Sequence, residues 1–183
     1  RAKFLAKPSS EANRITDYIC RLMLANPDRA LKYTADGKNV YTFGGKGAES
    51  AIYSVYGKDA LDNCLFVSDY SPELQIKGFL GSPNYTKSNR TYQTVIINGR
   101  YVNNDTVSFA VHNAFSDRHM KRQYPFYVLY LTLPYDKIDV NVHPNKLDVR
   151  FWDKNYVFKK VYSAVRGALD KNDYIKEIKV KRL

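Results

Sequence analysis

The residues most able to do chemistry lie in one short segment, IDVNVHPNKLDVRF, from Ile138 to Phe151. Its first half, KIDVNVHP, is predicted to be a strand that stops at Pro144, because proline cannot continue a paired strand. Pro144 and Asn145 hold the chain in a defined turn, so the Lys146 ammonium is expected to project from the domain edge as a compact point charge. A lone lysine on an exposed turn is usually only solvated.

A metal site or a carboxylate pair is the alternative interpretation of this segment. His143 precedes a proline, but the sequence has only two other histidines, and neither cysteine has ligand spacing to them. His143 is therefore expected to form hydrogen bonds that shape the loop. Asp139, Asn141 and Asp148 are spread along strand and turn, which favours a loop-shaping or solvated role over acid–base catalysis. No metal site is predicted.

The segment GGKGAES, residues 44–50, could cradle a phosphate, because glycine-rich turns before helices do so. It lacks the spacing of a P-loop, and Ala48 stands where serine or threonine should follow. A tight turn and a helix start are predicted instead. With no other glycine-rich nucleotide site in the sequence, the chain is not expected to hydrolyse ATP alone.

The overall charge suggests an anionic partner. The sequence has 29 basic and 18 acidic side chains, a formal net charge of +11, which attracts polyanions such as nucleic acid. Codon bias could produce the same composition. Cys20 and Cys64 lie among apolar neighbours and are predicted to be buried free thiols. The sequence has no apolar run long enough to cross a bilayer, and a cytoplasmic protein is expected.

The elements that must position these residues alternate between helices and strands. A helix is predicted over residues 10–25, a hairpin from ALKYT and NVYTF, and a helix over residues 48–56. The strand-like runs that follow are CLFVSDY, ELQIKGFLG, TYQTVIINGRYV with its Asn98-Gly99 turn, and FYVLYLTL, which reads as a central strand buried on both faces. A third helix follows Val102, with Asp105 as a possible cap, and the last helix has an inner face of Phe158, Val161, Tyr162, Val165 and Leu169. The pattern predicts a mixed α/β or α+β sandwich.

Three segments together resemble the bacterial MutL family of DNA mismatch repair proteins: RAKFL, VIINGRYV with the helix TVSFAVHNAF, and IDVNVHPNKLDVRF. The resemblance is to the second, transducer domain. It implies an α+β two-layer sandwich of ribosomal-protein-like fold with a left-handed βαβ crossover, as in GHKL ATPase transducer domains. The expected organisation is a connector and helix over 1–27, the transducer domain over 28–170, and the start of a charged linker over 171–183.

The resemblance also implies a function. Lys146 would reach the terminal phosphate of ATP bound in the preceding GHKL domain, with Asn141, His143, Pro144 and Asn145 supporting the motif. The full-length protein would use ATP and Mg, whereas this fragment alone would bind neither. Its partners would be the ATPase domain, DNA, the mismatch-recognition protein MutS, other repair proteins and a second copy of itself. A cytoplasmic, nucleoid-associated location is expected.

In the family, the Asn-Gly-Arg turn and the next helix lie beside a basic groove that holds DNA by its backbone. This sequence keeps the turn but has Asn103, Asn104 and Asp105 where basic residues are usual, which removes charge there. Phosphate contact without base readout is expected, with Tyr85 and Tyr92 mainly in core packing. The predicted DNA-binding residues are Arg100, Lys87, Arg90, Arg118, Lys121 and Arg122, with Asn98 and Gly99 forming the turn.

Other functions remain open from the sequence. A stand-alone nucleic-acid-binding module of ribosomal-like fold would explain the charge without an ATPase. A type II topoisomerase transducer has a similar shape, but its phosphate-sensing loop has a different signature from HPNK. A nuclease is disfavoured because the sequence lacks a metal cluster.

Overall fold

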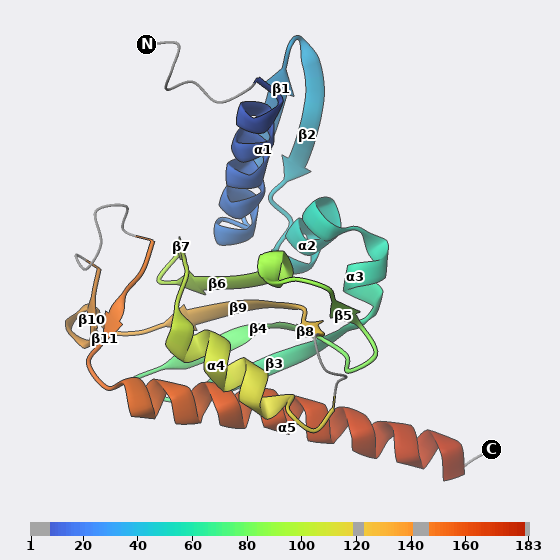
Figure 1. The fold of residues 1–183 in the computed structure, drawn as a ribbon, viewed down its shortest axis with the longest axis vertical. Coiled ribbons are helices and arrows are strands. Elements are labelled where there is room, and N and C mark those ends of the chain that lie inside the picture. Colours follow the sequence, from blue (N-terminus) through green and yellow to red (C-terminus); the bar gives the residue numbers. More distant parts are fainter. Residues whose placement is uncertain (1–7, 119–122, 141–146, 182–183) are drawn as a thin grey trace. The chain divides into compact units, whose positions relative to one another are not determined.

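The chain forms two compact units in the computed structural model, residues 1–61 and 62–183 (Figure 1). The structure describes residues 8–118, 123–140 and 147–181. Among the described helices, none combines the length and the hydropathy that a bilayer span requires. The second unit contains the sheet and most of the residues with predicted roles.

The first unit contains the predicted helix, hairpin and helix. The hairpin closes on Asp36 and Gly37, whose φ angles of 49° and 73° suit the tight turn that Asp-Gly favours. Met23 and Leu24 are each only 1% exposed, so the helix contributes them to packing. The elements are α1 (Pro8–Ala25), β1 (Ala30–Ala35), β2 (Lys38–Gly44) and α2 (Ala48–Tyr56), and a short helix that the sequence analysis missed, α3 (Lys58–Asp62), spans the boundary.

The second unit is built on a five-stranded mixed sheet in the order β3-β4-β9-β6-β7. All neighbouring pairs are antiparallel except β6 and β9, which run parallel and are connected through β7 and α4. This connection is the βαβ crossover that the resemblance implied. The strands are β3 (Cys64–Tyr70), β4 (Gln75–Gly81), β6 (Gln93–Ile97), β7 (Arg100–Val102) and β9 (Tyr127–Thr132).

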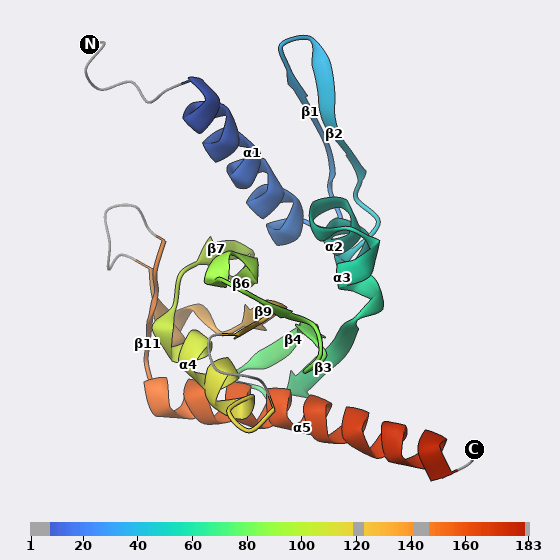
Figure 2. The ribbon, with the colours of Figure 1, turned by 45° about the vertical axis from the view of Figure 1, so that its right-hand side comes forward.

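Two helices, α4 (Asp105–Ala114) and α5 (Lys154–Lys181), cover one face of this sheet and lie side by side (Figures 1 and 2). The core joins Val107 and Val111 of α4 to Val161 and Val165 of α5, all 0% exposed, and to the facing strands. Burying such side chains contributes about 1.5 to 3 kcal/mol each. The predicted two-layer sandwich is confirmed.

Strand β9 is the middle strand, as predicted from its unbroken apolar run. Val128 and Leu129 point to opposite faces because successive strand residues alternate, and both are 0% exposed. Both faces of β9 are therefore covered.

Some local predictions differ from the structure. Of the strand predicted to run to Pro144, the structure describes β10 (Ile138–Asp139), which pairs with β11 (Arg150–Phe151), and residues 141–144 lie outside the described residues. Residues 82–91, to which the sequence pattern assigned no helix or strand before Thr91, contain β5 (Thr86–Lys87), which pairs with β8 (Tyr124–Pro125). The 3-10 turns are η2 (Arg90–Tyr92) and η3 (Tyr135–Lys137), and residues 171–181, expected to begin a linker, continue α5.

Candidate functional site

The segment that carries the predicted lysine starts and ends on paired strands. Ile138 pairs with Phe151 and Asp139 with Arg150, and the Trp152 amide donates to the Lys137 carbonyl at 2.9 Å. Phe151 is only 4% exposed, so it anchors this pair in the core. The base of the segment is therefore fixed to the sandwich. The predicted residues Asn141, His143, Pro144, Asn145 and Lys146 lie outside the described residues.

Residues just after the predicted lysine contact the start of α4. The Asn103 amide donates to the Leu147 carbonyl at 2.6 Å. The Asn104 side chain donates from Nδ2 to Asp148 Oδ1 at 3.0 Å and to the Val149 carbonyl at 3.2 Å. Asn104, and not the expected Asp105, also caps α4, because its Oδ1 accepts the Val107 amide at 3.2 Å. At Asn103 and Asn104, where the family usually has basic residues, the structure therefore has hydrogen bonds to residues 147–149 instead of positive charge.

The Asn98-Gly99 turn forms as predicted, with φ angles of 47° and 77°. Asn98 does more than turn the chain. Its Nδ2 donates to the Leu133 carbonyl at 2.9 Å, and its Oδ1 accepts the Leu133 amide at 2.9 Å. The turn therefore holds the chain that leaves β9, and Arg100 follows it as an exposed side chain on β7.

Lys87 and Arg90 lie over tyrosine rings. Lys87 Nζ is 4.2 Å from the centre of the Tyr85 ring and 4.8 Å from that of Tyr92, and Arg90 Cζ is 5.4 Å from that of Tyr124. Such contacts stabilise a cation without neutralising its charge, so both groups can still attract an anion. Residues 74–104 contain no aspartate or glutamate. We call Lys87, Arg90 and the three tyrosines the tyrosine–cation patch.

Tyr85 and Tyr92 are half-buried. Tyr85 packs edge-to-face on the buried Phe126 with the ring centres 5.7 Å apart, which agrees with the predicted packing role. Pairing of β5 with β8 brings the strands of the patch together, and Thr86 Oγ1 donates to Gln123 Oε1 at 2.9 Å. Strand pairing and side-chain packing therefore hold the residues of the patch in place.

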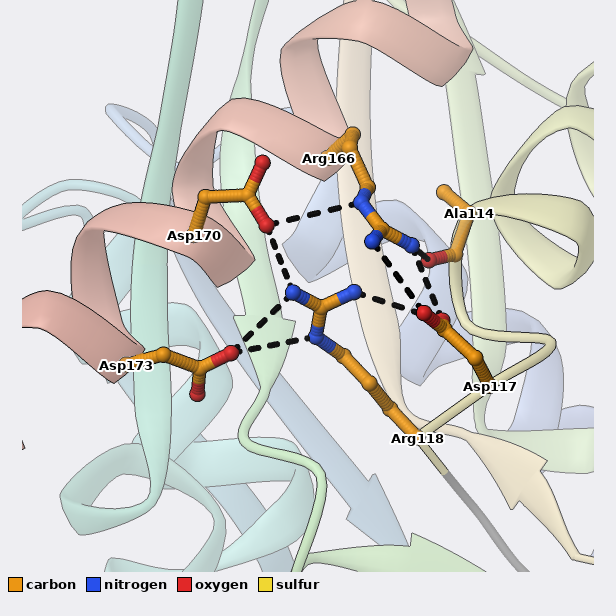
Figure 3. Close-up of polar contacts among 6 residues, drawn as sticks. All are labelled: Ala114, Asp117, Arg118, Arg166, Asp170 and Asp173. Carbon is orange, nitrogen blue, oxygen red and sulfur yellow. Dashed lines mark hydrogen bonds and ion pairs between the residues drawn. The ribbon is translucent and has the colours of Figure 1, made fainter.

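Arg118 has a different environment from the other predicted DNA-binding residues (Figure 3). Its guanidinium contacts Asp170 at 2.5 Å, Asp173 at 3.1 Å and Asp117 at 3.3 Å, and its side chain is 15% exposed. Three carboxylates balance its charge, so Arg118 is poorly suited to attract a phosphate. Lys121 and Arg122 lie outside the described residues.

The carboxylates around Arg118 also engage Arg166 of α5. Arg166 donates to both oxygens of Asp117, at 2.8 and 3.1 Å, and the hydrogen bond from Arg166 holds the pKa of that carboxyl below its ordinary value. Arg166 also donates to the Ala114 carbonyl at 3.4 Å (Figure 3). This network, drawn from the end of α4 and from α5, fastens the two helices together.

The glycine-rich segment is a tight turn and a helix start, as predicted. A Cβ at Gly45 would lie 2.7 Å from the Ala30 amide nitrogen, so the backbone passes too close there for any side chain. The Gly47 amide donates to the Pro27 carbonyl at 3.0 Å, and α2 begins at the next residue. That amide is thus used within the protein.

The cysteines and the other possible metal ligands form no metal site in the part of the chain that the structure describes. Cys20 and Cys64 form no disulfide, as predicted, but they are only partly buried. Burial raises the pKa of Cys64 to about 12, which keeps it a neutral thiol. Among the described residues, no three or more His, Cys, Asp or Glu side chains are grouped so that they could hold a metal ion.

The chain matches a known protein-family model over more than half of its length. A family model described as "DNA mismatch repair protein, C-terminal domain" matches residues 52–170. The chain belongs to this family. The match covers both the crossover with α4 and the segment around β10 and β11.

Relatives in this mismatch repair family include two proteins named DNA mismatch repair protein MutL. The one from Clostridium beijerinckii is 35% identical over 182 residues, which are 99% of this chain and 27% of the relative. The one from Caldanaerobacter subterraneus subsp. tengcongensis is 38% identical over 183 residues, 100% of this chain and 31% of the relative. The chain therefore spans about a third or less of these relatives, and the resemblance to MutL is confirmed.

Solved structures share the fold of this mismatch repair chain. The N-terminal domain of a DNA repair protein matches with a TM-score of 0.73 and 17% identity, covering 88% of this chain and 54% of that one. The Aquifex aeolicus MutL ATPase domain complexed with ADP matches with a TM-score of 0.57 and 15% identity, over 87% of this chain and 51% of that one. At these identities the likeness establishes the fold.

The structure thus brings some predicted residues of this mismatch repair chain together and separates others. Lys87 and Arg90 share the tyrosine–cation patch, whereas Arg118 belongs to the ionic network. Sequence reasoning missed Tyr124 as a partner of Arg90 and treated Asn104 only as a lost charge. The one available signal was that asparagine before a helix is a good cap.

Proposed function

We propose that this chain is the transducer domain of a DNA mismatch repair protein and that it acts beside a GHKL nucleotide-binding domain. Lys146 contributes its charge to the terminal phosphate of ATP held by that domain, and the sandwich relays the nucleotide state to DNA and to partner proteins. This chain alone is not an ATPase. The complete protein uses ATP and Mg.

The observation that carries this proposal is the anchored base of the lysine segment. Strands β10 and β11 pair directly before Val140 and directly after Val149, and Val149 and Phe151 are each 4% exposed. Fixed ends limit the positions that the intervening residues can reach, so contact with a partner costs less conformational entropy than it would for a segment with free ends. Family membership and the likeness of the fold to MutL ATPase structures support the same role.

Replacing Lys146 by alanine in the complete protein tests this role. We expect kcat for ATP hydrolysis to fall roughly tenfold or more, because a lost charge at a phosphate raises the barrier. The Lys159→Ala variant, at an exposed lysine on α5, is the matched control and should keep normal turnover. Normal turnover in Lys146→Ala, measured by steady-state phosphate release, would refute the proposal.

We further propose that the tyrosine–cation patch and Arg100 contact the DNA phosphate backbone. Lys87 and Arg90 keep their charge, are held over aromatic rings and lie in a stretch without acidic residues. The patch shows hydrogen-bonding groups suited to phosphate, so binding should depend on salt and ignore sequence. In this proposal the partners are DNA, the nucleotide-binding domain, MutS and a second copy of the protein. The proposed location is the cytoplasm, at the nucleoid.

Charge removal in the patch has a measurable signature. In the Lys87→Gln, Arg90→Gln double variant, we expect duplex DNA affinity to fall. The plot of log K against log salt should become shallower by about two, since each lost phosphate contact removes about 0.9. The Lys159→Gln, Lys171→Gln variant removes two charges from exposed positions on α5 and should keep the slope. If both variants bind DNA alike in a fluorescence anisotropy titration, the patch is not the contact.

A further inference from the structure

Hydrogen bonds join the start of α4 to the chain that follows the lysine segment. The backbone of Asn103 and the side chain of Asn104 together contact Leu147, Asp148 and Val149. The distances are 2.6, 3.0 and 3.2 Å, within or at the edge of the normal range for N–H···O bonds. Residues 44 or 45 positions apart are thus held at fixed separation.

Asn104 uses both ends of its amide. Its oxygen accepts the Val107 amide and caps α4, while its nitrogen donates to the Asp148 carboxylate and to the Val149 carbonyl. The residue is 8% exposed, so water does not readily replace these partners. A cap requires only the acceptor, which Asp or Ser also supplies. The two hydrogen bonds that Asn104 Nδ2 donates are therefore not needed to cap α4.

The Asp148 carboxylate completes this arrangement. Its Oδ1 accepts both the Asn104 side chain at 3.0 Å and the Val149 amide at 2.7 Å. The same oxygen thus orders the local backbone and accepts the hydrogen bond from the start of α4. Hydrogen bonds to a carboxylate are stronger than neutral ones.

The other arm of the segment is held by the same hairpin and helix unit. Asn98, in the turn between β6 and β7, makes two reciprocal hydrogen bonds with the Leu133 backbone. Asn98 therefore fixes the chain before β10, and Asn104 fixes the chain after the lysine segment. The turn and the start of α4 therefore hold the chain at two places, before β10 and just before β11.

We propose that Asn104 is a positioning residue, which ties the N-terminus of α4 to Leu147–Val149 and so sets the approach of the preceding lysine to the neighbouring nucleotide site. The inference rests on the proposed function of Lys146 and adds the element that governs it. Movement of α4 shifts the chain after the lysine through this tie, and nucleotide contact at the lysine bears on α4 in return. Such reciprocity is required of any coupling between two sites.

The Asn104→Asp variant separates the tie from the cap. The new carboxylate keeps an acceptor for Val107 but loses both donor hydrogens and faces the Asp148 carboxylate. We expect amide hydrogen exchange at Asn103 and Val149 to accelerate by about tenfold, while amides within α4, such as Ser108 and Phe115, keep their protection. This measurement uses the chain itself and needs no nucleotide.

In the complete protein, Asn104→Asp should lower kcat for ATP hydrolysis by about fivefold and leave ADP affinity unchanged, because ADP lacks the terminal phosphate. Asn113→Asp makes the same change at an exposed position of α4 and should leave both the kcat and the ADP affinity of the complete protein unchanged.

Exchanging the two groups provides a rescue. Asp148→Asn keeps an acceptor for Val149 and Asn104 but loses the charge, so by itself it should speed exchange and lower kcat less than Asn104→Asp does. Combined with Asn104→Asp, it supplies a donor facing the new carboxylate, and we expect exchange rates and kcat to return to within about twofold of normal. Unchanged exchange in Asn104→Asp, or a double variant no better than Asn104→Asp alone, would overturn the inference. Normal kcat in Lys146→Ala would instead refute the proposed function, whatever the exchange measurements give.

Discussion

Replacing Gly78 by alanine is expected to lower the free energy of unfolding by about 3 kcal/mol or more, an overpacking penalty at the upper end of its class. Gly78 faces Leu129 across β4 and β9, and a Cβ there would lie 2.3 Å from the Val128 carbonyl oxygen and 3.0 Å from Leu129 Cα. Both near atoms belong to the backbone, so no side chain can move aside. The strands must separate, and they are the centre of the sheet. Urea unfolding followed by circular dichroism measures the loss.

The Gly167→Ala variant is the matched control for that result. Gly167 lies in α5, and a Cβ there would meet nothing within 4 Å. Alanine has the higher helix propensity, so the same substitution should raise the free energy of unfolding by about 1 kcal/mol. Opposite signs at the two glycines are expected. A loss at Gly78 no larger than about 1 kcal/mol would contradict the close approach of β4 and β9.

Replacing Phe151 by alanine is expected to lower the free energy of unfolding by about 3 to 5 kcal/mol. Phe151 is 4% exposed in the core cluster, pairs with Ile138, and is followed within three residues by α5. The variant leaves a cavity where β11 meets the core, which neighbouring side chains fill only partly. We also expect faster amide exchange at Trp152, whose amide donates to Lys137 across the same pair.

The next residue provides the comparison. Trp152 is 53% exposed, with Lys137 Nζ 4.0 Å from the centre of its ring. Its replacement by alanine removes this exposed cation–π contact and the contact with the Tyr156 ring, whose centre lies 6.0 Å away, so the loss should be about 1 to 2 kcal/mol. Equal losses at Phe151 and Trp152 would show that β11 does not anchor the segment in the core. Denaturant unfolding of the two variants decides the matter.

The regular elements could be predicted because they depend on neighbours in sequence. Apolar spacing predicted α1, α4 and the inner face of α5, and the Asn98-Gly99 pair predicted the turn between β6 and β7, where φ is positive at both residues. The unbroken apolar run predicted β9 as the middle strand. Short pairings were missed, since β5 and β8 have two residues each and too little length for a periodic pattern.

For the candidate site, too, the sequence predicted the residue types but not their partners. Lys87, Arg90 and Arg118 are equally basic in the sequence, yet the structure places the first two over tyrosines and surrounds the third with three aspartates. Asp170 and Asp173 are more than 50 residues from Arg118, and no local pattern brings them together. Charge alone therefore predicted a polyanion partner without saying which cations are free to meet it.

By itself, the sequence of this protein determined its elements, its excess of positive charge and the resemblance that named its family, because these depend on residue type and short spacing. Only the tertiary structure decided which arginine is neutralised and what holds the chain on either side of the lysine segment. Those outcomes depend on partners 35 to 55 residues apart in sequence, as with Asn98 and Leu133 or Arg118 and Asp173. Such partners meet only after the sheet and its helices have packed.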